Sequence, residues 1–154
     1  MNVISNASPI ILLDNVGRLD VLQALYKEVV IPEAVYKEVF EVQKRTERPG
    51  WIKVEKVSNK GTVRFLMNSL GSGESEAIVL ALESKADLLL LDDYHARVYA
   101  NSFGLRITGV AGIIVDAKDK GIIGNVKKVL SDLIKKDYRI SDSLYNAIIK
   151  EAGE

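Results

Sequence analysis

Residues 73–93 read GESEAIVLALESKADLLLLDD, and this stretch joins the two kinds of element that decide the fold. Its first part predicts a helix over 73–85, because its apolar residues recur at helical spacing. Its second part, 87–91, is Asp87 followed by a continuous leucine run, which is typical of a parallel strand buried on both faces. We therefore expect an α/β domain in which this strand is the central one.

Short β-branched runs and helix-length apolar stripes alternate on both sides of this stretch. Strands are predicted at 2–6, 27–31 and 105–107, with an edge strand or extended segment at 51–57. Helices are predicted at 9–17, 19–26, 32–43, 61–70, 94–103, 109–121, 125–136 and 141–152. Ser8 and Thr108 are the expected N-caps of two of these helices. The alternation indicates a mainly parallel sheet.

Composition narrows the classes of function. The length of 154 residues suits one domain over 1–154, with the last two helices, about 125–152, packing against it or forming a C-terminal extension. Twenty-one basic and twenty-one acidic residues cancel, so any nucleic-acid surface must be local. The absence of cysteine excludes disulfides and thiolate sites and fits a cytoplasmic address. No apolar run approaches the roughly 20 residues of a membrane span, so no membrane association is expected.

Several polar side chains follow the predicted strands. In open parallel sheets, ligands bind beyond the carboxyl ends of the strands, where Asn6 and the pair Asp92 and Asp93 fall. At about 100° per residue, Glu74 lies within the apolar stripe of its helix and points inward. Glu38 flanks the stripe of the helix over 32–43, and taken alone it fits a solvated boundary residue equally well.

Local roles compete for some of these residues. One of Asp92 and Asp93 is the natural N-cap of the helix over 94–103, and the other is then available for chemistry; the sequence does not choose between them. Glu76 is expected at the third helical position, where it interacts with the helix dipole. His95, the lone histidine, is expected on a solvated helix surface.

Carboxylates that converge in one crevice repel one another unless a cation neutralises them. Oxygen ligands without cysteine favour a hard ion, Mg²⁺ or Mn²⁺, over zinc. The glycines form neither a dinucleotide fingerprint nor a P-loop, so a nucleotide cofactor is not predicted.

Five segments together resemble the PIN-domain family, and within it the prokaryotic PIN-like subgroup related to VapC-type toxin ribonucleases. They are VISNASPIILLDNVGRLDVL (3–22), VVIPEAVYKEV (29–39), GSGESEAIVLALE (71–83), LLLLDDYHAR (88–97) and LRITGVAGIIVDAKDKG (105–121). They span nearly the whole chain. The combination in this order, rather than any single motif, is specific.

The resemblance implies a metal-dependent ribonuclease with a three-layer fold, a central parallel sheet of four or five strands, and acids gathered at its carboxyl edge. The family's metal-site positions match Asn6, Glu38, Glu74 and Asp93 or its neighbour Asp92. Ser8 matches the hydroxyl that braces the first ligand. Catalytic members usually carry Asp at the place of Asn6. An Asn carbonyl can still bind Mg²⁺, but it removes one negative charge.

Three hypotheses about function follow, from different classes. The favoured one is a Mg²⁺- or Mn²⁺-dependent endoribonuclease that cleaves single-stranded or loop RNA, and it includes the toxin of a toxin–antitoxin pair. The alternative is a nucleic-acid-binding or regulatory module with weak or no nuclease activity because of Asn6; metal affinity distinguishes the two. The third hypothesis is a plain interaction protein whose acids are helix caps and surface charges. It predicts that neutralising Glu74 stabilises the fold or leaves it unchanged and does not affect any activity.

Basic side chains at the rim would hold the RNA phosphates. The candidates are Lys44, Arg45, Arg48, Arg97 and Arg106, although scattered basic residues in a net-neutral protein most often serve solubility. Trp51 or Tyr94 could stack a base, but packing in the core or at an edge is the expectation for either aromatic. The resemblance further implies a small antitoxin partner and a homodimer.

Overall fold

The fold is built on one parallel sheet. A computed structural model describes residues 1–43, 45 and 47–154. Within these residues, five strands pair in the order β3-β2-β1-β4-β5. They are β1 (Val3–Ser5), β2 (Val29–Pro32), β3 (Ile52–Glu55), β4 (Leu88–Leu90) and β5 (Ile107–Thr108). The central strand is β1, so the prediction that the leucine strand is central is wrong. The leucine strand, β4, lies next to β1 and pairs with β1 on one side and with β5 on the other.

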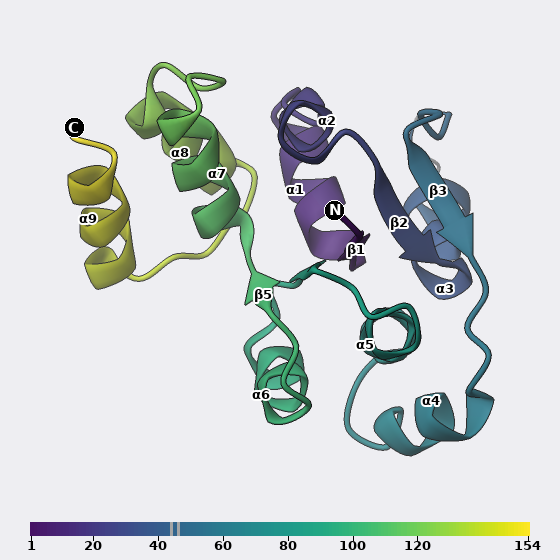
Figure 1. Cartoon of the computed structure of the whole chain (residues 1–154). Helices are drawn as coiled ribbons and strands as arrows, with labels where there is room; N and C mark the ends of the chain where they lie inside the picture. Colours follow the sequence, from purple (N-terminus) through teal and green to yellow (C-terminus); the bar gives the residue numbers. More distant parts are fainter. Residues whose placement is uncertain (44, 46) are drawn as a thin grey trace.

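Helices cover both faces of the sheet, which confirms the three-layer α/β fold (Figure 1). One face carries α1 (Ala7–Asn15), α2 (Asp20–Tyr26), α7 (Val110–Asp119), α8 (Val126–Lys135) and α9 (Asp142–Glu151). The other face carries α4 (Lys60–Leu66), α5 (Ser72–Glu83) and α6 (Tyr94–Ser102). The short α3 (Glu33–Tyr36) continues into a π-helical segment, η1 (Lys37–Val42), and packs against α5. No helix of the described chain has the length and apolar character that a membrane crossing requires.

The strand residues alternate between two buried clusters. Val3 of β1 joins the cluster under α1 and α7, whereas Ile4 joins the cluster under α5 and α6. In the same way Leu88 and Leu90 of β4 face one layer and Leu89 faces the other. Successive side chains of a strand point to opposite faces, so a strand covered on both faces is mostly apolar, and the buried Ser5 of β1 donates its hydroxyl to the Asn6 carbonyl.

Two predicted N-caps are wrong. The first helix, α1, begins at Ala7 with Asn6 in the N-cap position, and Ser8 lies inside its first turn. Helix α7 begins at Val110 after Gly109, so Thr108 belongs to β5. The Val110 N–H donates instead to the side chain of Asp92, which follows β4. The start of α7 could not be assigned from neighbouring residues, because a side chain distant in the sequence accepts its first N–H.

The strand order places a crevice beside β1. Chain order runs from β1 to β2 and β3 on one side of the sheet, and from β4 to β5 on the other. The carboxyl ends of β1 and β4 therefore border the topological switch point, where open parallel sheets bind their ligands. Helix α5 leads into β4, so its N-terminus lies at this same carboxyl edge of the sheet (Figure 1).

Candidate functional site

Two oxygen atoms from distant segments converge on Gly73. Asn6 follows β1 and is 4% exposed, and Glu38 projects from η1. A Cβ atom on Gly73 would lie 3.3 Å from Glu38 Oε2 and 3.4 Å from Asn6 Oδ1. The missing side chain lets the first turn of α5 approach both oxygens. Glu38 begins a wide π-helical turn, in which its carbonyl accepts the Gln43 N–H, and such turns recur at functional sites.

Glu74 lies in the electric field of two other carboxylates. Burial raises its pKa, and the negative charges of Asp93 and Glu38 raise it further. The backbone N–H of Gly71 and the side chain of His95 lower it by less, so the net pKa shift is upward. The three carboxylates, which come from three separate elements, are therefore within electrostatic reach of one another. A cation at this edge would relieve their repulsion.

Glu76 plays a different part from the one predicted. Glu74 occupies the third helical position of α5, because the N-cap is Gly71. The Glu76 Oε1 atom instead accepts the Ala34 N–H at 3.1 Å, in the first turn of α3. The prediction that Glu76 serves the start of its own helix is therefore wrong. Its hydrogen bond ties α5 to the segment that carries Glu38.

The two adjacent aspartates have separate partners. Asp93 is the N-cap of α6, where its Oδ1 accepts the Ala96 N–H at 2.9 Å. Asp92 accepts the Val110 N–H with Oδ1 at 3.0 Å and with Oδ2 at 3.2 Å. Burial raises the pKa of Asp92, while this N–H and the Arg97 charge lower it by less. Both carboxylates thus hold helix N-termini, and within the described chain Oδ2 of the exposed Asp93 has no hydrogen-bond partner.

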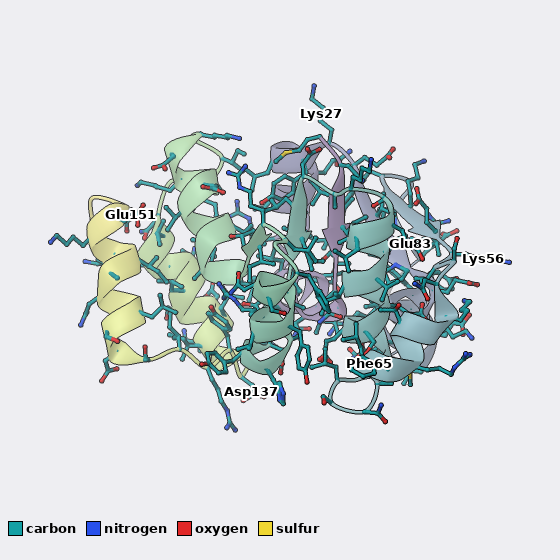
Figure 2. All side chains as sticks on the ribbon, turned by 60° about the horizontal axis from the view of Figure 1, so that its bottom comes forward. Lys27, Lys56, Phe65, Glu83, Asp137 and Glu151 are labelled. Carbon is teal, nitrogen blue, oxygen red and sulfur yellow. The ribbon has the colours of Figure 1, made fainter. Side chains whose placement is uncertain are left out.

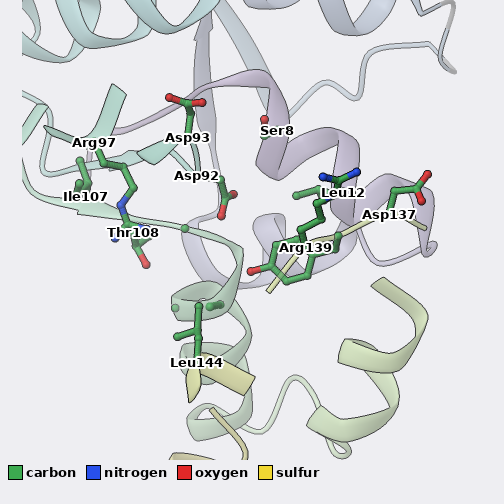
Figure 3. Close-up of a pocket in the computed structure, with 14 residues that line it drawn as sticks. Ser8, Leu12, Asp92, Asp93, Arg97, Ile107, Thr108, Asp137, Arg139 and Leu144 are labelled. Atoms are coloured by element: carbon green, nitrogen blue, oxygen red, sulfur yellow. The ribbon is translucent and has the colours of Figure 1, made fainter. Parts of the chain in front are cut away.

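Both aspartates line a cavity of about 760 Å³ at the carboxyl edge (Figure 3). Ser8 of α1 and Arg97 of α6 also line it, and the turn after α8 adds Tyr138 and Arg139. Burial and the charge of Asp92 raise the pKa of Tyr138 to about 12. The phenol therefore remains a hydrogen-bond donor at neutral pH.

A second cavity of about 590 Å³ lies between η1 and α5. Glu38 and Glu74 line it, together with Lys37 and Lys60. The predicted ligand residues are thus divided between two cavities: Asp92 and Asp93 line the larger one, and Glu38 and Glu74 line the smaller one together with Gly73.

Among the predicted basic residues that the structure describes, Arg97 alone lies at this edge. Arg45 pairs with a carboxylate near the C-terminal end of α1 at 2.7 Å. Arg48 donates to a backbone carbonyl of β3, and Arg106 precedes β5 at the opposite edge of the sheet. Lys44 lies outside the described residues.

The two candidate aromatics differ in exposure. Trp51 packs against the core, as expected. Tyr94 is 82% exposed, so the expectation that it packs in the core or at an edge is wrong. His95 is exposed on the surface of α6 and stacks on Tyr99, with ring centroids 5.7 Å apart, which confirms its predicted surface position.

The donor chemistry fits a hard divalent ion. The edge offers carboxylate oxygens from Glu38, Glu74 and Asp93 and an amide oxygen from Asn6. As the side chains stand, no three His, Cys, Asp or Glu residues in the described chain are close enough together to hold an ion. The fit rests instead on the shared edge and on the pKa of Glu74, which burial raises most and the charges of Asp93 and Glu38 raise further.

Sequence reasoning missed Gly73, Tyr138 and Arg139. A signal for Gly73 was present, because a glycine inside a helix costs about 0.5–1 kcal/mol relative to alanine and so suggests a close approach. The other two residues carried no local signal. Asp137, with φ +67°, ends α8 in a left-handed turn, and this turn brings them to a cavity formed mainly by segments much earlier in the chain.

Comparison with known families agrees with this geometry. The description PIN domain belongs to the family model that matches residues 2–154, and members of this nuclease-type fold generally depend on divalent metal. The comparison with curated proteins found no match. Because the family match covers nearly the whole chain and the five-stranded parallel sheet agrees with it, this chain belongs to the PIN-domain family.

Proposed function

We propose that the protein is a metal-dependent endoribonuclease that hydrolyses phosphodiester bonds of single-stranded or loop RNA. One observation carries this proposal. The side-chain oxygens of Asn6 and Glu38 both lie close to Gly73, next to Glu74, whose pKa is raised by burial and by Asp93 and Glu38. A cluster of this kind is costly for a protein that does not use it, because like charges repel.

Each residue at the edge has a separate task in this proposal. When bound, Mg²⁺ or Mn²⁺ supplies Lewis-acid chemistry that activates water and neutralises charge on the phosphodiester. Glu38, Glu74 and Asp93 provide the negative oxygens, and Asn6 provides a neutral one. Asp93 is held in place because its other oxygen caps α6.

Neighbouring residues support these ligands and meet the substrate. Asp92 fixes the start of α7 at the end of β4, which shapes the cavity next to Asp93. Arg97 is placed to contact a substrate phosphate, and Ser8 can donate a hydrogen bond into the same cavity.

The test is cleavage of a mixed single-stranded RNA by purified protein with Mg²⁺ or Mn²⁺. Glu74→Gln and Asp93→Asn are expected to lower the rate by about 100-fold or more, and a chelator is expected to abolish it. Glu41→Gln is the matched control, because Glu41 is exposed on the same segment as Glu38. Full activity in Glu74→Gln, or activity in chelator, would overturn the proposal.

Asp92→Asn separates the two aspartates. An asparagine oxygen can still accept the Val110 N–H, so this variant is expected to lose less activity than Asp93→Asn. The reverse order would make Asp92 the ligand.

A second candidate function is a nucleic-acid-binding or regulatory module without efficient hydrolysis. The neutral amide of Asn6, where catalytic family members usually carry a carboxylate, favours it. Calorimetry with Mn²⁺ discriminates between the two functions. If the wild type binds RNA but neither binds Mn²⁺ nor cleaves, and Asn6→Asp gains both properties, the protein is the binding module.

Further parts of the proposal rest on the family resemblance or on composition. They are the role of toxin, a small antitoxin partner, a homodimer and a cytoplasmic location. Sedimentation velocity of the purified protein tests the dimer, and co-purification of a small protein that blocks RNA cleavage tests the antitoxin. We also propose that residues 1–154 fold as one unit that includes α8 and α9.

A further inference from the structure

The outer face of α6 forms a hollow beside the acidic edge. A cavity of about 350 Å³ is lined by Asp92, Tyr94, Arg97, Val98 and Asn101. The four residues of α6 recur at three- and four-residue intervals, which places them on one face of the helix. Helix α6 is anchored through its other side, where the small residues Ala96 and Ala100 are fully buried. The hollow therefore lies on a face that the rest of the described chain leaves open.

This face of α6 exposes two large, mainly apolar side chains to solvent. Tyr94 is 82% exposed and Val98 is 49% exposed. An exposed aromatic ring next to a guanidinium and a carboxamide matches the chemistry that recognises an unpaired nucleotide. A base stacks on the ring, the amide bonds the edge of the base as both donor and acceptor, and the guanidinium meets the phosphate.

This face is continuous with the acidic edge. Tyr94 directly follows Asp93, and Arg97 lines both this hollow and the larger cavity that holds Asp93. Figure 3 shows the Arg97 side chain extending toward Thr108 at the end of β5. Within the described chain Arg97 makes no salt bridge that would occupy its guanidinium.

We propose that the outer face of α6 binds one nucleobase of an unpaired nucleic-acid strand, with the base stacked on Tyr94 and its edge bonded by Asn101. Arg97 holds the phosphate that links this nucleotide to the one at the acidic edge. The inference rests on the proposed function of that edge and adds the surface on which one nucleotide of its substrate binds. In a duplex both faces of a base are covered by its neighbours, so Tyr94 selects unpaired strands.

The test measures binding without cleavage. A fluorescently labelled, unpaired RNA oligonucleotide is titrated with protein in the presence of chelator, and anisotropy gives the affinity. Tyr94→Ala is expected to weaken binding about tenfold, whereas Tyr94→Phe, which keeps the stacking face, stays within about twofold of wild type. Asn101→Ala is expected to reduce the preference among oligonucleotides of different base composition.

Controls separate this face from general effects of mutation. Phe65, labelled in Figure 2, is 69% exposed on α4, a helix that packs against α5, so Phe65→Ala is the matched loss of an exposed aromatic ring and is expected to bind like wild type. Urea unfolding of each variant checks that the fold is retained. A DNA strand of the same sequence, run in parallel, shows whether the sugar contributes. A duplex competitor is expected to displace the labelled strand poorly.

The outcomes keep the two proposals apart. Unchanged affinity in Tyr94→Ala, or no RNA binding by the wild type, overturns the base site, while the cleavage assay with Glu74→Gln judges the nuclease separately. If Tyr94→Ala dissociates a dimer in sedimentation velocity and leaves RNA affinity unchanged, the face belongs to a second copy of the chain, and the inference is wrong.

Discussion

The acids at the carboxyl edge differ in how many of their side-chain oxygens accept backbone hydrogen bonds. Both carboxylate oxygens of Asp92 accept the Val110 N–H, whereas only one oxygen of Asp93 accepts the Ala96 N–H. Glu76, although only two residues from Glu74, is occupied by the Ala34 N–H. Acids that look equivalent in the sequence thus differ in their hydrogen bonds, because the backbone N–H groups of neighbouring helices engage some of their oxygens.

Glu74 makes stability depend on pH in a direction that can be tested. Its pKa is raised in the folded protein, so the folded state holds the proton more tightly than the unfolded chain does. The favourable contribution is complete below the ordinary pKa of 4.5 and is lost as pH rises through the folded value. Glu74→Gln is therefore expected to be more stable than wild type at pH 7, on the order of 0.5 kcal/mol after solvent screening, and no more stable in acid.

Urea unfolding in chelator at a series of pH values measures this difference. Glu41→Gln, the control on η1, is expected to follow the wild type throughout. Added Mn²⁺ is expected to stabilise the wild type more than Glu74→Gln, because the ion binds the folded state. A Glu74→Gln variant that is less stable at pH 7 would show that the carboxylate is favourable where it stands, and would remove the charge argument for a cation.

At the scale of elements, the close approach of α5 to Asn6 and η1 depends on Gly73. A Cβ atom there would lie close to Glu38 Oε2, at 3.3 Å, and to Asn6 Oδ1, at 3.4 Å, whereas its 3.5 Å contact with Val35 is ordinary. Gly73→Ala gains about 0.5–1 kcal/mol of helix preference but must shift these two oxygens by a few tenths of an ångström. We expect its free energy of unfolding to change by less than about 1 kcal/mol, while RNA cleavage and Mn²⁺ affinity fall at least tenfold.

Gly61→Ala is the matched control for this prediction. Gly61 is also the second residue of its helix, α4, and a Cβ atom there meets only Asn59 Oδ1, at an ordinary 3.6 Å. Cleavage by Gly61→Ala should equal that of wild type. Wild-type activity in Gly73→Ala as well would mean that the spacing between α5 and Glu38 does not matter for the reaction.

At the scale of the whole molecule, α8 and α9 share the core that lies under β1 and β2. Leu130 of α8 is fully buried in the cluster that also contains Val3 and Ile31, and Trp51 packs against the same cluster. Contacts of this kind couple the C-terminal helices to the sheet. The proposal of a single folded unit therefore has a direct test.

Leu130→Ala is expected to lower the free energy of unfolding by about 2–5 kcal/mol. Trp51, the single tryptophan, reports on the β3 side of the sheet, and far-ultraviolet circular dichroism reports on all the helices. Both transitions are expected to shift together. Leu144→Ala on α9, where the side chain is 44% exposed, should cost less than about 1 kcal/mol. A shift seen by circular dichroism but not by Trp51 would make the last two helices a separate extension.

The sequence by itself determined the elements and the edge at which the polar residues gather. The helix predicted over 73–85 is α5, the leucine run is β4, and the π-helical η1 lies inside the helix predicted over 32–43. Periodicity and flanking residues are local properties, and parallel strands necessarily share a carboxyl edge. For this reason Asn6 and Asp93 could be placed at one edge without a structure.

Only the tertiary structure decided which strand is central, which aspartate keeps a free oxygen and which aromatic is exposed. The position of β1, the bond from Asp92 to Val110 and the pair of Arg45 with Asp14 all join segments far apart in the chain. Such contacts depend on how the sheet and its helices pack against one another. Many other acidic or basic residues of the chain have the same chemistry, so residue type alone does not identify the partners. No local pattern encodes that choice, so neither the caps from other strands nor the open face at Tyr94 could be predicted from the sequence.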